Sequence, residues 1–173
     1  MSKEGLLEQL GKFDGMDLGK ALPPVDQWNP DLSGTMDLVI KSNGEWLHEG
    51  EPFVRDKLVR LFSTILKKEG SKYYLVTPVE KWEIQVEDLP FQVVLAHKDE
   101  SDIIRVVTDV GDEFYIDPQH PLLMDATGVP FVEVRAGLMA RFSRNAYYTL
   151  SDMAIEQDDG YFVISGEERY RIG

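Results

Sequence analysis

Cysteine is absent from the 173 residues of the chain. This absence excludes disulfide bonds, thiolate catalysis and iron–sulfur ligation, and it removes the ligand that most structural zinc sites use. No window approaches the ~18 uninterrupted apolar residues that a membrane-spanning helix needs. Residues 1–5 also lack the apolar stretch of a signal peptide. We therefore expect a cytoplasmic protein that does not insert into membranes.

Positive charge is scarce: 18 lysines and arginines stand against 31 aspartates and glutamates, a formal net charge of −13. Because such a field repels phosphate, general binding to nucleic acid or to anionic lipid is not expected. Apolar residues make up 43% of the chain and charged residues 28%, which are values typical of a globular protein with a real core. The length suits one ordinary domain or two small ones.

Recognisable catalytic motifs are missing as well. The sequence has neither of the glycine-rich phosphate loops nor a nucleophile elbow. Its histidines, His48, His97 and His120, share no spacing that indicates a metal site. Acidic pairs such as Glu113 and Asp117 are expected from composition alone among so many carboxylates. The sequence therefore predicts no catalytic residue, no metal and no cofactor, and it favours a binding protein over an enzyme.

Helical periodicity occurs in three places. Residues 3–13 predict a short amphipathic helix. Residues 55–68 predict the clearest helix, with one apolar stripe that Gly70 ends; the stripe consists of Leu58, Leu61, Phe62, Ile65 and Leu66. Ser143 is typical of an N-cap and predicts a second main helix that runs to Ala154.

Alternating patterns predict the strands. Asn43-Gly44 between residues 36–40 and 45–48 indicates a β-hairpin, because both turn residues tolerate positive φ. Residues 132–142 give the strongest alternation and predict one long strand with a bend at Gly137. The prolines in residues 21–30 predict an ordered arm that docks Val25 and Trp28. Further strands are expected at residues 73–77, 82–86, 91–96, 103–108, 113–116 and 161–164.

The two halves follow the same order of elements. Each has strands, an amphipathic helix, a glycine turn and an aromatic-rich strand, with residues 58–76 in the first half matched to residues 146–164 in the second. This order predicts an ancient duplication. A literal similarity between residues 58–63 and 138–143 is set aside, because the first string has a period of 3.6 and the second a period of 2. We expect an N-terminal helix and docking arm over residues 1–30, a first α+β repeat over 31–90 and a second over 91–173.

Several strings resemble one bacterial family in the same order. They are PPV at 23–25, NGEW at 43–46, LVRLFS at 58–63, TPVEK at 77–81, VEDLPF at 86–91 and VRAGL at 134–138. Together they resemble the family catalogued as domain of unknown function 1285. The resemblance implies an α+β protein of two intimately packed, duplicated domains, each an antiparallel sheet with one main helix. It further implies that the second is similar to a pleckstrin-homology fold, and that a nucleotide-like ligand binds between the domains in bacterial signal transduction.

The basic residues suggest where such a ligand would bind. Arg135 and Arg141 share the polar face of the long predicted strand and offer donors suited to phosphate. Lys81, Arg55 and Arg60 would add positive charge. Trp46 and Trp82 would supply a flat surface for stacking. The predicted function is thus a sensor that binds a small anionic ligand.

Three alternatives remain open. The arginines could pair with Glu80, Glu83 or Glu133 on neighbouring strands instead of binding a ligand. The tryptophans could be core or arm anchors. The protein could also be an adaptor whose second domain binds a protein partner.

Overall fold

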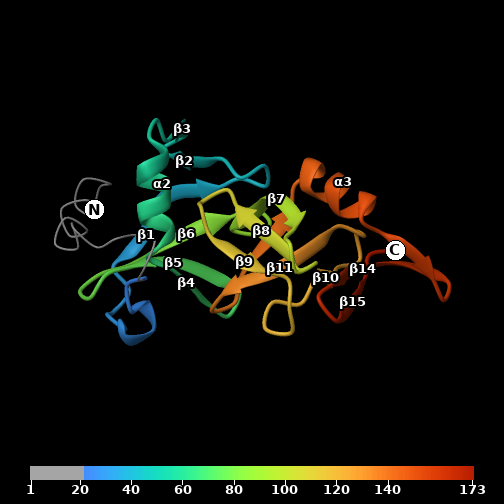
Figure 1. Ribbon diagram of the computed structural model, residues 1–173. Helices are drawn as coiled ribbons and strands as arrows, with labels where there is room; N and C mark the ends of the chain where they lie inside the picture. The colour runs from blue at the N-terminus through green and yellow to red at the C-terminus, as the bar shows by residue number, and fades with distance from the viewer. Residues whose placement is uncertain (1–21) are drawn as a thin grey trace. The chain divides into compact units, whose positions relative to one another are not determined.

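The chain forms two compact units in the computed structural model, which describes residues 22–173 (Figure 1). The first unit extends to Asp88 and the second comprises Leu89–Gly173. The helix predicted at residues 3–13 lies outside the described residues. Within residues 22–173, no helix has the length and apolar character needed to cross a membrane.

The first unit contains a six-stranded sheet and one helix, α2. Its strands lie in the order β3-β2-β1-β6-β5-β4, and all neighbours are antiparallel except the central pair, β1 and β6, which is parallel. The elements are η2 (Val25–Gln27), β1 (Gly34–Ile40), β2 (Trp46–His48), β3 (Glu51–Pro52), α2 (Asp56–Ser63), β4 (Leu66–Glu69), β5 (Lys72–Val76) and β6 (Lys81–Val86).

The hairpin predicted at Asn43-Gly44 is confirmed: it joins β1 to β2. Gly44 has a φ of +90°, and the Asn43 side-chain oxygen accepts a hydrogen bond from the Glu45 amide at 3.0 Å. This hairpin places Ile40 opposite Trp46, and both side chains are buried. The turn residues therefore set a register that fills the core.

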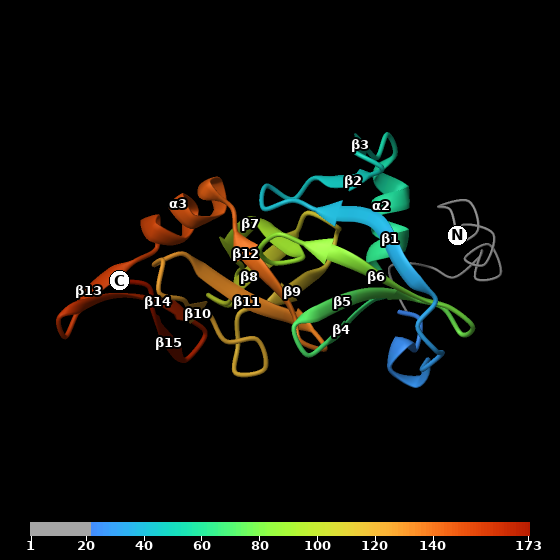
Figure 2. The same cartoon turned by 180° about the vertical axis from the view of Figure 1, so that it is seen from behind.

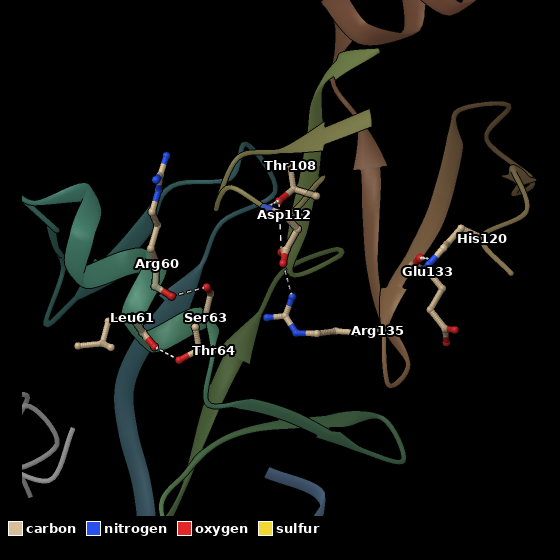
Figure 3. A network of polar contacts seen from close by, with 9 residues as sticks. All are labelled: Arg60, Leu61, Ser63, Thr64, Thr108, Asp112, His120, Glu133 and Arg135. Atoms are coloured by element: carbon tan, nitrogen blue, oxygen red, sulfur yellow. Dashed lines mark hydrogen bonds and ion pairs between the residues drawn. The ribbon is translucent and has the colours of Figure 1, made fainter. Parts of the chain in front are cut away.

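Helix α2 ends at Ser63, so the helix predicted over residues 55–68 was too long. Ser63 and Thr64 donate their hydroxyls to the carbonyls of Arg60 and Leu61 at 2.6 Å each, and in this way satisfy the end of the helix (Figure 3). The chain then enters β4, which Gly70, at φ +60°, turns into β5. Apolar residues at 65 and 66 fit a helix and a strand alike, so spacing alone could not place this boundary.

The proline-rich arm lies along the first unit. Pro23 is buried, and Val25 and Trp28 are half-buried. The amine of Lys67, on edge strand β4, donates to the Trp28 carbonyl at 3.2 Å and to the Asn29 side chain at 3.0 Å. The arm thus covers a sheet edge that would otherwise be open.

The second unit contains two sheets and helix α3 (Figures 1 and 2). The larger sheet has the order β10-β11-β12-β7-β8-β9, and β7 and β12 form its parallel central pair. The smaller has the order β13-β14-β15. The elements are β7 (Phe91–Lys98), β8 (Ile104–Thr108), β9 (Glu113–Tyr115), β10 (Leu123–Met124), β11 (Pro130–Arg135), β12 (Leu138–Phe142), α3 (Arg144–Asp152), β13 (Ile155–Gln157), β14 (Gly160–Ser165) and β15 (Glu168–Arg171).

The single strand predicted over residues 132–142 is in fact a hairpin. β11 and β12 are antiparallel and are joined by Ala136 and Gly137, whose φ values are +48° and +79°. Two residues with positive φ form the tight turn that a hairpin favours. Val132 and Val134 before the turn are buried, as are Leu138 and Ala140 after it, so the alternation continues through a reversal of the chain.

The Ser143 cap is confirmed: its hydroxyl accepts the Ala146 amide at 3.2 Å at the start of α3. Helix α3 ends at Asp152, two residues before the predicted end, because Ile155 already pairs with Phe162 in the β13–β14 ladder. The closing strand predicted at residues 161–164 lies within β14.

Both six-stranded sheets have the same topology, which confirms the duplication and the α+β class. In each, the first strand pairs parallel with the sixth. The second and third strands extend the sheet outward from the first, and the fifth and fourth strands extend it outward from the sixth. This topology matches β5 with β11 and β6 with β12, so the predicted match between residues 58–76 and 146–164 was wrong. Helix α2 precedes the fourth strand of its sheet, whereas α3 follows the sixth strand of the other. The likeness of the second unit to a pleckstrin-homology fold stays a prediction.

Candidate functional site

Lys81 opens strand β6 and is bound within its own sheet. Its amine lies 2.5 Å from a carboxylate oxygen of Glu69 on β4 and 4.3 Å from the centre of the Tyr74 ring. The hydrogen bond from Lys81 lowers the pKa of Glu69 below its usual value. The positive charge of Lys81 is therefore compensated by Glu69.

Arg135 ends strand β11 and reaches the turn between β8 and β9 (Figure 3). Its Nη1 lies 2.8 Å from Oδ1 of Asp112, and both side chains are about four-fifths buried, with 19% and 25% exposed. The Asp112 amide donates to the Thr108 hydroxyl oxygen at 3.0 Å, which orders this turn. The guanidinium also lies 5.2 Å from the centre of the Phe91 ring. A carboxylate and an aromatic ring thus hold Arg135.

Arg141, on β12, has the same kind of environment. Its Nη1 lies 2.6 Å from Oδ2 of Asp125, and its guanidinium is 6.0 Å from the centre of the Phe131 ring. The Thr127 amide and hydroxyl donate to Oδ1 of Asp125 at 2.9 and 2.5 Å. The bonds from Thr127, and then the bond from Arg141, lower the pKa of Asp125 to about 2. Asp125 is therefore a carboxylate throughout the neutral range.

The structure does not bring Arg135 and Arg141 together. They belong to two strands, not to the one strand predicted, and they lie at opposite ends of the β11–β12 hairpin, because Arg135 pairs with Leu138 beside the turn and Arg141 pairs with Phe131. Ion pairing was the predicted alternative, and the structure pairs Arg135 with Asp112 and Arg141 with Asp125. An anionic ligand at either arginine would have to compete with a bound carboxylate.

The two tryptophans of the predicted site are both anchored in the first unit. Trp46 is only 3% exposed and meets the edge of the Phe53 ring at 6.4 Å, so it offers no open face for stacking. Trp82 is half-buried against Gly34, where an added Cβ would lie 3.2 Å from the ring. Both indole N–H groups are buried without a hydrogen-bond partner among the described residues.

Arg55 and Arg60 differ from the other predicted cations. Arg55 immediately precedes α2, Arg60 lies within it, and both are exposed, as is Lys57. None of these three side chains takes part in an ion pair within the described part of the chain. Arg55 and Arg60 are therefore the two predicted cations that form no ion pair among residues 22–173, and Lys57 is a third cation beside them.

The sequence analysis missed Asp109, in the turn between β8 and β9. Its Oδ1 accepts the Gln92 amide at 3.0 Å, and its own amide donates to the Gln92 carbonyl at 2.9 Å. Burial raises the pKa of Asp109 to about 6. The string of residues 109–112 identifies a turn, but only the pairing with β7 shows that its first carboxyl is enclosed.

One side of the larger sheet in the second unit is open. Leu95, Val107 and Glu113 lie side by side across β7, β8 and β9, and His97, Arg105 and Tyr115 form the next row. Leu95 is 51% exposed and Tyr115 41%. A bulge after Val93 inserts Val94, which is 42% exposed, into the same strand. The alternate residues Ala96, Ile104 and Val106 form part of the buried core.

No group of three or more histidine, aspartate or glutamate side chains in residues 22–173 is placed to hold a metal ion. His120 instead bonds through Nδ1 to the Glu133 carbonyl at 2.9 Å (Figure 3) and packs against Phe114, with ring centres 4.7 Å apart. These contacts give His120 a structural role in the second unit.

Arg135→Ala should lower the free energy of unfolding by about 1–3 kcal/mol, because it leaves the largely buried carboxylate of Asp112 without its cation. Urea denaturation measures the loss. Lys41→Ala is the matched control, since its pair with Glu87 is solvated and should contribute much less. Adding Asp112→Asn to the Arg135 variant should recover part of the stability. Equal losses for the Arg135 and Lys41 variants would contradict a structural role for this pair.

Asp109→Asn should change the pH dependence of stability. The folded-state pKa of about 6 lies above the usual 3.8. The stability that Asp109 contributes in its protonated form is therefore fully present below about pH 4, and it is lost as the pH rises through 6. The wild type should therefore lose about 2 kcal/mol relative to the variant between pH 4 and 7. Chemical denaturation at several pH values tests this.

Asp99→Asn is the control of opposite sign. Backbone amides, chiefly that of Ile103, lower the pKa of Asp99, so the stability it contributes is present above pH 4 and is lost as the pH falls. If the Asp109 variant follows the wild type at every pH, the buried carboxyl does not titrate in this window.

Comparison with known proteins assigns the chain to a family. The model described as domain of unknown function (DUF1285), N-terminal domain, matches residues 23–89, and the model described as protein of unknown function (DUF1285), C-terminal domain, matches residues 90–172. No protein with a curated description matches the chain.

Two crystal structures are similar to the structure of this chain. A DUF1285 family protein from Silicibacter pomeroyi DSS-3 is 37% identical, with 88% of each chain covered and a TM-score of 0.78. A DUF1285 family protein from Shewanella baltica OS155 is 25% identical, with 68% of this chain and 91% of that chain covered and a TM-score of 0.57. With both family models matched in order along nearly all of the described residues, the chain belongs to the DUF1285 family.

Proposed function

We propose that the protein is a non-catalytic adaptor that binds a protein partner through the open side of the larger sheet in its second unit. The observation that carries the proposal is the group formed by Val94, Leu95 and Tyr115, all more than 40% exposed on strands whose other side is buried. A place in bacterial signal transduction, which the family resemblance implies, is part of the same proposal.

The composition of this open side supports a protein partner. Apolar and aromatic side chains stand beside an Arg105–Glu113 ion pair and beside His97, so an apolar centre has a polar surround. Protein interfaces often have this arrangement, and tyrosine and arginine are enriched among the residues that contribute most to binding. Covering Leu95 and Tyr115 would gain roughly 25 cal/mol for each Å² of apolar surface removed from water.

The bulge at Val94 strengthens this argument. In a regular strand, neighbouring side chains point to opposite faces, and one of each pair would be buried. Here Val94 and Leu95 are consecutive and both exposed, because the extra residue interrupts the pairing of β7 with β8. Bulges commonly redirect side chains in this way, and this one doubles the apolar contact that β7 can make.

Leu95→Asp should abolish partner binding without unfolding the protein, because the new charge stands on an exposed position. Affinity capture from a bacterial lysate, quantified by mass spectrometry, should show a protein retained by the wild type and lost with the variant. Leu32→Asp in the first unit is the matched control, since Leu32 is 58% exposed. A partner retained equally by all three proteins would place the binding surface elsewhere.

A small anionic, nucleotide-like ligand is the second candidate, and one observation favours it. Arg55, Lys57 and Arg60 are exposed at α2 and form no ion pair among residues 22–173, in an otherwise acidic protein. Such a group attracts phosphate, whereas Lys81, Arg135 and Arg141 are already held by carboxylates. We therefore assign the anionic-ligand hypothesis to α2 rather than to the arginines of the second unit.

Arg55→Ala combined with Arg60→Ala separates the two candidates. If the second is right, ATP, GTP or a cyclic dinucleotide should raise the melting temperature of the wild type and have no effect on this double variant. Lys98→Ala combined with Arg144→Ala removes two exposed cations of the second unit and serves as control. No shift with any nucleotide would leave the adaptor as the supported function.

A further inference from the structure

The chain contains three asparagines, Asn29, Asn43 and Asn145, and the chemical stability of each depends on the residue that follows it. An asparagine side chain deamidates when the main-chain nitrogen of the next residue attacks its amide carbon. Pro30 follows Asn29, and a proline nitrogen has no proton to lose before such an attack. Ala146 follows Asn145 within helix α3, where its amide is already hydrogen-bonded. These two asparagines are therefore protected.

Asn43 is exposed in the β1–β2 turn and is followed by Gly44. Glycine has no Cβ, so its nitrogen can approach the side-chain carbon of Asn43 closely. In the closed turn, the Gly44 amide donates to the Lys41 carbonyl at 3.0 Å. The Glu45 amide donates to Oδ1 of Asn43 at 3.0 Å. Because the attack needs a free Gly44 nitrogen and a rotated Asn43 side chain, it proceeds when the turn opens.

Glu87, immediately after β6, fastens the residues that precede Asn43. Its Oε2 accepts the Ser42 amide at 2.9 Å, and its Oε1 lies 2.9 Å from the Lys41 amine. The hydrogen bond from Lys41, and then the bond from the Ser42 amide, lower the pKa of Glu87, so this side chain is a carboxylate in the neutral range. The Glu87 amide also donates to the Ile40 carbonyl at 3.0 Å. One residue thus binds three consecutive positions before Asn43.

We infer that Asn43 is a site of spontaneous covalent modification and that Glu87 slows the reaction by holding the turn closed. The Gly44 nitrogen, having lost its proton to solvent, forms a bond to Cγ of Asn43, and the bond between Cγ and the side-chain nitrogen breaks with release of ammonia. Water then opens the resulting cyclic imide. Opening at the main-chain carbonyl gives isoaspartate, and opening at Cγ gives aspartate. This inference is independent of the proposed function.

The isoaspartate product changes the course of the main chain. Its peptide link runs through Cβ and Cγ, which lengthens the turn and converts the hydrogen-bonded oxygen of the side chain into a main-chain oxygen. The pairing of Ile40 with Trp46 lies directly beyond this turn, and both side chains are buried. A longer turn does not fit the register that fills the core. The modification therefore loosens the β1–β2 hairpin, and it does not reverse because the ammonia has left.

The first test follows the modification in the full chain. Folded samples and samples in urea are incubated at mildly alkaline pH, digested, and analysed by mass spectrometry with electron-transfer fragmentation, which distinguishes isoaspartate from aspartate. Both products should accumulate at Asn43 in the folded chain while Asn29 and Asn145 stay intact, and the rate at Asn43 should be at least threefold higher in urea. Modification that begins at another asparagine, or an Asn43 that stays intact in the folded chain, would overturn the site. Equal rates in the two samples would overturn protection by the closed turn.

A pair of variants tests the role of Glu87. Glu87→Ala removes the side-chain bonds to Ser42 and Lys41, and it should speed modification of the folded chain at least twofold while leaving the rate in urea unchanged. Glu83→Ala is the matched control, because it removes a nearby glutamate of β6 that is paired with Lys72 at 3.2 Å, and it should react as the wild type does. An unchanged rate in the Glu87 variant, or an equal acceleration in both variants, would overturn this role.

The effect on the hairpin has its own measurement. The isoaspartate form, isolated by chromatography, should melt at a lower temperature than the unmodified protein. Asn43→Asp carries the same added charge on an unchanged main chain and should melt closer to the wild type. Equal decreases for the two forms would assign the effect to charge, and a wild-type melting temperature for the isoaspartate form would show that the hairpin is not loosened; either result would overturn this part of the inference.

Discussion

One parallel pairing of strands holds each six-stranded sheet together. Without the pairing of β1 with β6, the first sheet would separate into two three-stranded sheets, each with a new open edge; the pairing of β7 with β12 has the same role in the second. The residues at these ladders are among the most deeply buried, as Ile40, Phe91 and Ala140 illustrate. Every other pairing in these sheets joins strands that follow one another in sequence. The parallel pair therefore joins the first and the last strand of each sheet, which are the two strands farthest apart in sequence.

The two units share a sheet topology but have different surfaces, because the segments that connect their strands differ. A helix, α2, joins the two halves of the first sheet, whereas the corresponding connection in the second is a loop over residues 116–122. The second unit adds α3 and the small sheet, which Ser165 fastens by bonds to the Ile104 amide and the Ile116 carbonyl. The second unit exposes Val94, Leu95 and Tyr115 on β7 and β9. The surfaces of the two units thus differ where each copy departs from the shared topology.

The candidate cations fall into two groups, those held in ion pairs within a unit and those exposed at α2. Lys81, Arg135 and Arg141 each contact a carboxylate and an aromatic ring, which compensate the charge and offset the entropy lost when the long side chain is fixed. Within residues 22–173, the cations at α2 have neither a carboxylate nor a ring as partner, and they are exposed. A strongly acidic protein can therefore present exposed cations at α2, which attract anions.

The sequence alone determined what depends on local rules. Asn43-Gly44 specified a hairpin and Ser143 a helix cap, because a turn or a cap needs only a few adjacent residues with the right φ and side-chain oxygen. Alternation located the strands at residues 73–77, 82–86, 91–96, 103–108 and 113–116, which are observed as β5 to β9 with small shifts at the ends. The duplication was also visible, although its elements were matched incorrectly.

Only the tertiary structure decided features that depend on distant neighbours. Leu66 leaves the helical pattern because β5 offers a strand partner, and Ala136-Gly137 reverses the chain without disturbing the alternation of buried residues. Arg135 selects Asp112, and Asp109 becomes enclosed, through pairings across a sheet that no local pattern encodes. The sequence named Arg135 and Arg141 as candidates but gave no sign of Asp112 and Asp125 beside them, because a side chain's charge is local whereas its burial and its neighbours are properties of the whole fold.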